Sequence, residues 1–485
     1  MNVKYVSRII SFAVMISSVF MVVPLGIAFF DGQTNNAISY FISMALMLVF
    51  SICILFFTRN HSTNIYAQEG FAATGISWIV ISLFGALPFT ISGEIPHFID
   101  ALFEIVSGFT TTGSSILTDV EALSRCHLYW RSFSHWLGGM GMLVFILAII
   151  PQAKKNEGGG IYLMRAESPG PSVGKFTPHI KHTALILYGL YVLLTVVCVV
   201  FLLFGGLPLF DSLCIAFGTA GTGGFGILND SMASYSSYIQ IVVTIFMFLF
   251  GINFNLYFLI LLGQFKDIFK NEELRAYLVI FFGAIILITL NIFTMFSSVG
   301  EAIKHASFQV SSIMTTTGFA SVDFELWPAF SKAILFLLMF VGACAGSTGG
   351  GLKVARILLL GKSIVKTISN ALHPRRISVV KMDGKIVDEN VVNSTNAYLA
   401  VYCILMLISF AIISIDNYSL GTNLSAVVAC FNNIGPGFEM VGATGNYSSF
   451  SVLSKLVLTA DMLLGRLEIF PLLTLISPDL WSRKR

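Results

Sequence analysis

The sequence predicts an all-α polytopic membrane protein, and three observations lead to that fold class. Of the 485 residues, 56% are hydrophobic and 11% are charged, whereas about 25% of the residues of a soluble domain are charged. Several apolar runs reach the roughly 20 residues that a helix needs to cross the hydrocarbon core of a bilayer. Between these runs, short segments rich in threonine and glycine recur, which indicates one structural unit used several times.

The apolar runs define ten predicted spans. The first follows Lys4 and Arg8, and we interpret it as a retained helix, because it is too long for a signal-peptide core and lacks a small-x-small cleavage site before Asp31. Ten spans place both ends of the chain on the same side of the membrane. The predicted spans are 9–30, 38–58, 73–93, 128–150, 182–204, 236–263, 275–297, 332–361, 395–414 and 450–475.

The placement of basic residues predicts which side that is. Of the 28 Lys and Arg residues, 22 lie on one face, at the chain ends and mainly in the loops 151–181, 264–275 and 353–390. Cytoplasmic loops carry the excess of Lys and Arg in membrane proteins. Both termini are therefore expected to be cytoplasmic.

On the opposite face lie four segments that are too apolar for loops and too short to span. Each is preceded by an apolar stretch that predicts a short helix, with Asp100, Asp211 and Asn423 as the N-caps of three of them. The third copy offers no such cap, and its start is left open between residues 301 and 305. The four segments are SGFTTTG (107–113), FGTAGTG (217–223), SIMTTTG (312–318) and ACFNNIG (429–435).

Each unit thus consists of a span, a short half-helix, a polar non-helical segment and a second span. A half-helix that ends inside the membrane points its partial negative charge at whatever follows. Non-helical backbone at membrane depth occurs only where it is buried or lines a water-filled cavity. We expect the four segments to converge on one axis, where carbonyls replace the hydration shell of a cation. None of them contains a carboxylate, which favours a weakly held monovalent ion such as potassium.

Other kinds of site find little support in the sequence. The run GTAGTGGFG (218–226) resembles a phosphate-binding loop, but no Lys-Ser or Lys-Thr pair follows it and no βαβ pattern surrounds it. The seven cysteines form neither a CxxC motif nor a Cys/His metal spacing, and we interpret them as core residues. His179 and His182 are typical of a solvated loop. Because no paired carboxylates, catalytic triad or metal cluster is evident, no enzyme activity is predicted.

Taken together, these features resemble the Trk/Ktr/HKT superfamily of potassium transporters, and most closely its bacterial TrkH members. The resemblance covers essentially the whole chain and implies four M1–pore-helix–M2 repeats around a central pore, plus two extra N-terminal transmembrane helices. The implied organisation is an N-terminal transmembrane hairpin (1–70), pore repeat 1 (71–155), pore repeat 2 (180–265), pore repeat 3 with a glycine-rich intramembrane loop (274–370) and pore repeat 4 (394–482).

The resemblance also implies a potassium selectivity filter at the four segments. Glycine at the first filter position resembles potassium-selective members, whereas serine there goes with sodium-preferring plant relatives. The chain departs from a potassium-channel filter because it lacks a TVGYG motif and has Ile434 where other segments have threonine. The implied filter glycines are Gly113, Gly223, Gly318 and Gly435, and the implied carbonyl ligands beneath them belong to Thr111, Thr112, Gly221, Thr222, Thr316, Thr317, Asn433 and Ile434.

The glycine-rich stretch VGACAGSTGGGL (341–352) lies within the predicted span 332–361. Each glycine costs a helix interior about 1 kcal/mol relative to alanine, so we expect the helix to break there. We interpret the stretch as a flexible flap below the third segment that obstructs the pore; the alternative is close packing of small residues between helices. TrkH-like proteins carry such a loop as their gate, which implies gate residues Gly346, Ser347, Thr348, Gly349, Gly350 and Gly351.

Arg466 lies inside the last predicted span. A buried arginine is costly in a membrane and is by default a functional hypothesis. Glu468, two residues away, points to another face of a helix and is expected to be a poor partner. We predict that the Arg466 guanidinium lies under the filter as an electrostatic barrier; the alternative is neutralisation by another helix or snorkelling. A basic residue in this last helix is also a feature of the resembling family.

The resemblance further implies a homodimer and a ring of TrkA-like cytosolic RCK subunits that docks on the basic loops, including 151–181. A nucleotide (NADH, NAD or ATP/ADP) acts only through that partner, because no cofactor site is predicted in this chain, and no nucleic acid is expected. The expected function is potassium uptake through a channel-like pore in the bacterial cytoplasmic (inner) membrane. The alternative is an ion-coupled secondary transporter that moves protons or sodium with potassium. Intramembrane carboxylates favour that alternative; Glu104 is the nearest candidate, expected in a pore helix near the outside.

Overall fold

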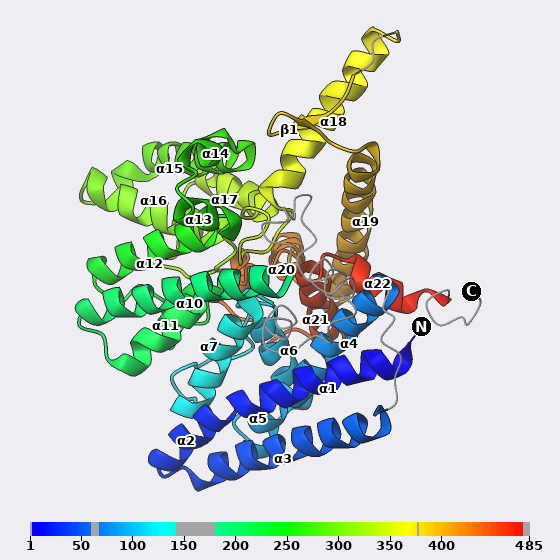
Figure 1. Cartoon of the computed structure of the whole chain (residues 1–485). Coiled ribbons are helices and arrows are strands. Elements are labelled where there is room, and N and C mark those ends of the chain that lie inside the picture. Colours follow the sequence, from blue (N-terminus) through cyan, green and yellow to red (C-terminus); the bar gives the residue numbers. More distant parts are fainter. Residues whose placement is uncertain (1, 60–66, 142–179, 376–377, 479–485) are drawn as a thin grey trace.

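The computed structural model describes residues 2–59, 67–141, 180–375 and 378–478. The regular secondary structure in these residues is helical apart from one small β hairpin (Figure 1). The helices of the first part are α1 (Val3–Phe20), α2 (Val22–Phe30), α3 (Thr34–Phe57), α4 (Ala67–Gly85), α5 (Leu87–Ser92), α6 (Phe98–Phe109) and α7 (Arg125–Gly139). The next part contains α10 (Ile180–Phe204), α11 (Leu209–Gly221), α12 (Ser237–Phe250), α13 (Phe254–Leu261), α14 (Phe265–Lys270), α15 (Glu272–Ile292), α16 (Val299–Met314) and α17 (Ala329–Val341). The last part contains α18 (Val354–Leu372), the antiparallel strands β1 (Lys381–Met382) and β2 (Lys385–Ile386), α19 (Glu389–Ile413), α20 (Leu420–Phe431), α21 (Val452–Arg466) and α22 (Phe470–Ile476).

Six helical stretches of the described residues are long and apolar enough to cross a membrane, and a seventh results if the bent pair α12 and α13 is counted as one span. They correspond to the predicted spans 9–30, 38–58, 73–93, 182–204, 275–297 and 395–414, so the multi-span helical class is confirmed. The six are Val3–Phe30, Thr34–Phe57, Gln68–Ser92, Ala184–Phe204, Glu272–Met295 and Glu389–Asp416.

Three predicted spans are wrong as continuous helices. Span 236–263 bends by 88° between α12 and α13, where Asn253 caps the new helix by accepting a hydrogen bond from the backbone of Asn255. Span 332–361 is interrupted between α17 and α18. Span 450–475 breaks after α21, because Pro471 cannot continue a hydrogen-bonded helix. The predicted span 128–150 begins as α7, and its second half lies outside the described residues.

Four short helices, α6, α11, α16 and α20, end inside the four predicted segments, so the first residues of each segment are helical and the rest are not. Each packs against the long helix that precedes it, namely α4, α10, α15 and α19. Each of α7, α12, α17 and α21 packs against the short helix before it and against the next short helix, and α21 returns to α6. These contacts form a closed circle of eight helices with the four segments at the inner ends of the short ones.

The short helices begin earlier than the sequence suggested. Their N-caps are His97, Pro208 and Ser419, so the predicted caps Asp100, Asp211 and Asn423 are wrong. Asp100 and Asp211 lie in the first helical turn instead, where a negative charge still favours the positive end of the helix. The third helix, whose start the sequence left open, is capped by Ser298, whose side chain accepts a hydrogen bond from the Glu301 backbone.

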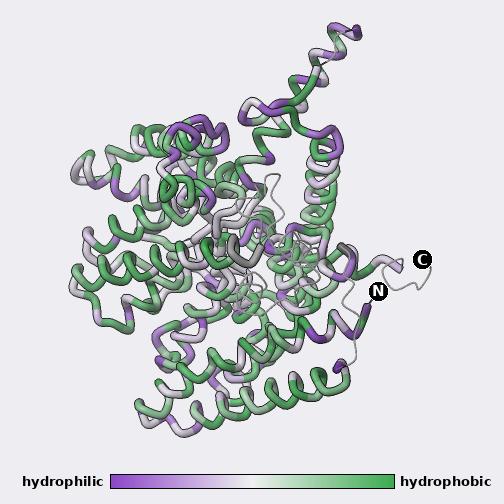
Figure 2. Tube along the Cα trace, in the orientation of Figure 1, coloured by the Kyte–Doolittle hydropathy of each residue, from purple (hydrophilic) through white to green (hydrophobic). Residues whose placement is uncertain are grey.

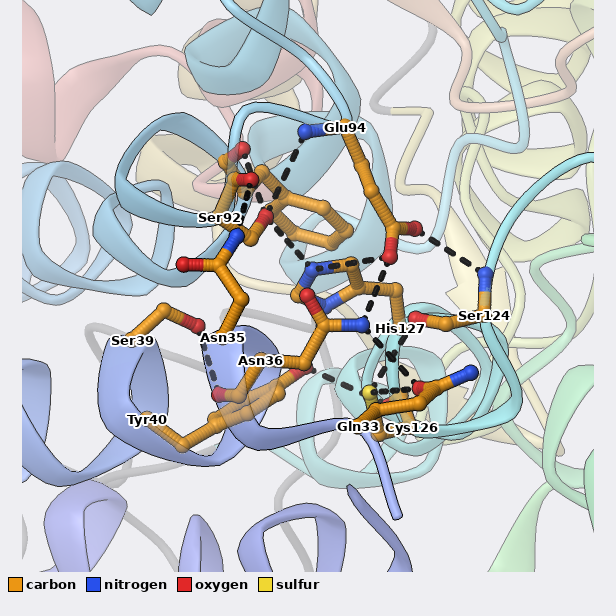
Figure 3. Close-up of polar contacts among 11 residues, drawn as sticks. Gln33, Asn35, Asn36, Ser39, Tyr40, Ser92, Glu94, Ser124, Cys126 and His127 are labelled. Carbon is orange, nitrogen blue, oxygen red and sulfur yellow. Dashed lines mark hydrogen bonds and ion pairs between the residues drawn. The ribbon is translucent and has the colours of Figure 1, made fainter. Parts of the chain in front are cut away.

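The N-terminal helices are attached to this circle by a buried polar network (Figure 3). Tyr40 of α3 places its hydroxyl 2.7 Å from Nδ1 of His127, which is fully buried at the start of α7. On the other side of the ring, Nε2 of His127 lies 2.9 Å from Oγ of Ser92. Asn36 donates to Glu94 across the same junction at 2.7 Å. The network fixes α3 to α7 through side chains rather than through apolar packing alone.

Helix α18 and the β hairpin project away from the rest of the molecule (Figure 1). The peripheral helices are largely hydrophobic along their length, whereas the end of this projection is mostly hydrophilic (Figure 2). Arg375 and Lys381 lie beyond the helix, and Lys362 pairs with Glu272 at its base. The projecting helix is amphipathic, since it also exposes Ile364, Val365, Ile368 and Leu372.

Candidate functional site

The four predicted segments meet in a closed ring. Glycines in the ring are so close to the next segment that an added Cβ would overlap or press on a neighbouring backbone carbonyl. The contacts run from the first segment to the second, third and fourth and back to the first: Gly113 meets Gly223, Gly224 meets Thr317, Gly318 meets Ile434, and Gly435 meets Thr112. Segments that are about 100 residues apart in sequence, or more than 300 for the fourth and the first, therefore touch through their main chains.

The four segments share an unusual backbone conformation. One non-glycine residue of each has a positive φ, and these residues are Thr111 (55°), Thr222 (52°), Thr316 (59°) and Asn433 (55°). For a β-branched residue such a φ is an outlier, and strain of this kind persists only where surrounding structure imposes it. The residue after each donates its N–H to the carbonyl five residues earlier, at 2.8–2.9 Å, which ends the short helix in a tight turn.

This shared conformation shows which residues of the four segments occupy equivalent positions, which we call the structural register of the segments. Two residues after the strained residue stands a glycine with positive φ: Gly113 (84°), Gly224 (77°), Gly318 (85°) and Gly435 (99°). In the second segment this is Gly224, one residue later than the predicted Gly223. Gly223 takes the buried place that Thr112 has in the first segment, and Gly221 becomes the last residue of α11.

Eight buried carbonyl groups of the ring accept no hydrogen bond from any residue that the structure describes. They belong to the strained residues and their successors: Thr111, Thr112, Thr222, Gly223, Thr316, Thr317, Asn433 and Ile434. By contrast, the Gly221 carbonyl accepts from the Thr222 hydroxyl at 2.6 Å. Buried carbonyls are almost always paired, so a ring of unpaired ones is suited to holding a positively charged guest.

His135 of α7 holds the first two segments at a fixed separation. The backbone N–H of Phe225 donates to its Nε2 at 3.2 Å, so the proton of the neutral ring sits on Nδ1. That Nδ1 donates to the carbonyl of Gly108, at the end of α6, at 2.8 Å. The side chain is fully buried, and its position in the sequence gave no signal of this role.

The glycine-rich loop 342–353 lies against the inner side of the ring. The helix breaks as predicted, since α17 ends at Val341 and α18 begins at Val354. The backbone N–H of Gly350 donates to the hydroxyl of Thr316 at 2.6 Å. A Cβ at Gly349 would press on the Thr315 carbonyl, and one at Gly350 on the Asn432 carbonyl. Glycine is therefore required here for close approach of two backbones.

The far side of this loop is tethered to neighbouring helices. Glu273 of α15 is buried, and its Oε1 accepts from the backbone of Ala345 at 2.6 Å and of Ala355 at 3.2 Å. Gly346 accepts from the backbone of Phe254, at the bend between α12 and α13, at 3.0 Å. The carboxylate bridges the two ends of the loop, and the loop is hydrogen-bonded to the bend between α12 and α13.

Arg466 is the last residue of α21 and reaches three parts of the site. Its Nη1 donates to the carbonyl of Thr348 in the loop at 2.9 Å and to the hydroxyl of Thr111 in the first segment at 3.2 Å. Its Nη2 donates to the carbonyls of Gly139, at 2.6 Å, and Gly138 at the end of α7. A helix C-terminus carries partial negative charge, so this end of α7 stabilises the guanidinium.

Two further basic residues near the loop were missed by sequence reasoning. Lys353 has a positive φ of 72° and donates to the carbonyl of Gly349. Arg356 forms an ion pair with Glu468 and lies 4.3 Å from the centre of the Tyr398 ring. Glu468 thus neutralises Arg356, in agreement with the expectation that it is a poor partner for Arg466. The signal available in the sequence was the pair of basic residues directly after the glycine run.

At the outer end of α20, Glu439 completes the cap of the helix. Its Oε2 accepts from the backbone N–H of Thr422 at 3.1 Å and from that residue's hydroxyl at 2.9 Å. Hydrogen bonds from the hydroxyls of Ser419 and Thr422 lower the pKa of this carboxyl below its usual value. The group therefore stays ionised near neutral pH and keeps a negative charge close to the outer end of the fourth segment.

Comparison with known proteins gives one consistent family. Residues 36–483 match the family model described as TrkH, cation transport protein. The chain is 34% identical over 494 residues to the Trk system potassium uptake protein TrkH of Escherichia coli K12, covering 99% of this chain and 100% of that protein. It is 33% identical to the Trk system potassium uptake protein TrkG of the same strain, over 99% of both chains. The structure resembles the crystal structure of the potassium transporter TrkH from Vibrio parahaemolyticus, with a TM-score of 0.88 and 30% identity over 99% of this chain and 100% of that chain.

Proposed function

This chain belongs to the TrkH family of cation transport proteins, and from that membership we propose that it takes up potassium through a channel-like pore in the bacterial cytoplasmic membrane. Relatives that align with nearly the whole chain are potassium uptake proteins of the Trk system. The single observation that carries the proposal is the closed ring of buried carbonyls without hydrogen-bond partners. Such a ring replaces the water shell of a weakly hydrated cation without binding it too tightly to leave.

In this proposal the circle of helices is four M1–pore-helix–M2 repeats around the pore. The repeats are α4–α6–α7, α10–α11–α12, α15–α16–α17 and α19–α20–α21, and they correspond to the predicted ranges 71–155, 180–265, 274–370 and 394–482, although α4, α15 and α19 begin before residues 71, 274 and 394. The N-terminal hairpin, predicted as 1–70, precedes them. The closed circle of helix contacts and the shared strained backbone both support this arrangement. The filter register follows the structure, with Gly113, Gly224, Gly318 and Gly435 as its outer glycines.

We propose that the loop 342–353 and Arg466 together form the gate beneath this filter. The loop presses on the third and fourth segments, while Arg466 joins the loop to the first segment. The loop blocks the path sterically, and the guanidinium repels an approaching cation. Opening requires the hydrogen bond between Arg466 and the carbonyl of Thr348 to break.

A cytosolic partner fits the same picture. The projecting part, α18 with the β hairpin, carries basic residues such as Lys366 and Arg375 and also exposes apolar side chains such as Val365 and Leu372, so it offers a partner both charge and apolar surface. Its helix leads directly out of the loop, so a protein bound to the projection pulls on the gate. We propose that this partner is a TrkA-like RCK ring that supplies nucleotide control, that the chain acts as a homodimer, and that both termini are cytoplasmic.

One carboxyl favours the alternative of an ion-coupled transporter. Asp461 of α21 is 1% exposed, accepts a hydrogen bond from Ser409 at 2.7 Å through Oδ1, and leaves Oδ2 without a partner among the described residues. A buried carboxyl of this kind is a candidate proton carrier. Glu104, the candidate from sequence, is instead held in an ion pair with Arg131.

Electrical recording from the purified chain in liposomes separates the two functions. A pore passes discrete single-channel currents that follow the potassium gradient, with potassium and rubidium preferred over sodium. A coupled transporter gives no channel-sized events and moves protons or sodium in fixed ratio with potassium. Absence of any potassium flux, with or without the cytosolic partner, would contradict both.

A further inference from the structure

A buried ion pair lies directly behind the first filter segment. Glu104 is on α6 and Arg131 on α7, and both Nε and Nη2 of the arginine lie 2.7 Å from Oε1 of the glutamate. The two side chains are 0% and 2% exposed. Charges inside a membrane protein are costly unless they are paired and hydrogen-bonded, so this pair must serve a requirement that apolar residues do not meet.

The glutamate end of the pair holds the first segment. The hydroxyl of Ser115 donates to Glu104 Oε1 at 2.9 Å and to Oε2 at 3.1 Å. The backbone N–H of Ile116 donates to Oε2 at 3.0 Å. These residues follow Gly113 directly, so the carboxylate fixes the main chain just outside the first filter glycine.

The arginine end of the pair holds the second segment. Nη1 of Arg131 donates to the carbonyl of Gly226 at 3.4 Å, and the guanidinium lies 4.0 Å from the centre of the Phe225 ring. Phe225 and Gly226 follow Gly224 directly. The ion pair therefore joins the two segments at the same height, immediately outside the glycines whose backbones touch.

The position of Glu104 is not charged in the other three repeats. Glu104 stands nine residues before Gly113, and the same spacing from the other positive-φ glycines gives Ile215, Gln309 and Ala426. Gln309 is buried and donates only to the carbonyl of Val322, at 3.4 Å, among the described residues. At this spacing among the described residues, the first segment is thus the one backed by a charged side chain.

We propose that Glu104 and Arg131 are positioning residues for ion selectivity: they set the distance between the carbonyls of the first and second segments and hence the size of the cation that the ring accepts. The proposal rests on the proposed function, because it assumes that the ring is the filter. Neither side chain touches the ion. Loss of the carboxylate charge frees the guanidinium to move away, and the second segment then loses the contacts of Arg131 with Gly226 and Phe225.

The test measures permeability ratios in liposomes that contain the full chain. Glu104→Gln keeps the size of the side chain and an acceptor for Ile116 but removes the charge, so we expect the potassium-to-sodium permeability ratio to fall on the order of tenfold, the effect of one charge-assisted hydrogen bond. Glu104→Asp should recover part of the ratio. Asp100→Asn is the matched control, since Asp100 lies on the same helix and pairs with Lys455, 2.6 Å away, rather than with a filter segment.

The outcomes distinguish the two proposals. If the wild-type chain shows no preference for potassium, the proposed function fails. If the wild-type chain is selective and folded Glu104→Gln retains its ratio, or if Asp100→Asn loses as much, the positioning role is overturned. Should Glu104→Gln yield no folded protein, Arg131→Lys carries the same test, because it keeps the charge but loses the forked contact with Glu104 and the contact with Gly226.

Discussion

Replacing Gly224 by alanine should damage ion selectivity, whereas the same change at Gly226 should not. Gly224 has a φ of 77°, and an added Cβ would overlap the carbonyl oxygen of Thr317 in the next segment. Gly226 lies in the same glycine-rich stretch, and the nearest heavy atoms to its added Cβ are 3.4 Å away, an ordinary contact. The two positions thus offer a matched pair within one segment.

The size of the effect follows from two terms. A residue with a side chain costs about 1–2 kcal/mol in the left-handed region. The overlap adds to this, because the obstacle is backbone and no rotamer change relieves it. If only the conformational cost, and not the overlap, affects ion binding at the proposed filter, 1–2 kcal/mol corresponds to a change of roughly 5- to 30-fold in an equilibrium. The Thr317 carbonyl is one of the ring's unpaired groups, so its displacement acts on the ion site itself.

The assay is the reversal potential of liposomes with potassium on one side and sodium on the other, with thermal unfolding as the check on folding. We expect the potassium-to-sodium ratio to fall at least fivefold for Gly224→Ala and to stay at the wild-type value for Gly226→Ala. A wild-type ratio in folded Gly224→Ala, or an equal loss in Gly226→Ala, would refute the structural register of the second segment.

Three further changes test the filter and the gate. Gly113→Ser places a side chain at a φ of 84° against the Gly223 carbonyl, so it should weaken discrimination between potassium and sodium; an unaltered reversal potential counts against the filter assignment. Arg466→Ala removes a charge that, at about 10 Å and an effective dielectric constant of about 20, repels a cation by about 1.7 kcal/mol; rubidium flux should rise more than tenfold, and an unchanged flux removes its gating role. Deletion of Ala345–Gly351 should also raise rubidium flux, and unchanged or lower flux in a well-folded protein disproves the flap.

The sequence predicted those parts of the fold that depend on local composition. Six of the ten apolar runs became stretches long and apolar enough to span, and the glycine run at 349–351 became a break, because each preference is set by the residues themselves. The positions of the four segments could also be predicted, since a non-helical polar stretch between two spans is unusual wherever it occurs. A single copy of this pattern would not have been sufficient for the prediction, and its recurrence in four places made the prediction possible.

What the sequence could not predict depends on contacts between distant residues. From the sequence, Gly223 and Gly224 are equally suited to the position equivalent to Gly113. The hydrogen bond from the Gly223 N–H to the Gly218 carbonyl fixes where α11 ends and thereby places Gly224 at that position. The N-caps predicted at Asp100 and Asp211 are wrong because aspartate is favourable both at the N-cap position and in the first turn of a helix. The roles of His135 and Glu273 arise only from packing, because both act on backbone groups of other elements.

The hydrogen bonds of the site imply that the proposed gate and the proposed filter do not move independently. The strained residues of the first and third segments, Thr111 and Thr316, use their hydroxyls to accept from Arg466 and from the backbone of Gly350. The same arginine holds the loop through Thr348. Displacement of the loop therefore removes a donor from the third segment and releases the arginine that supports the first. Because a positive φ at threonine persists only under such constraint, movement of the loop changes the carbonyls of the ring as well as clearing the path beneath them.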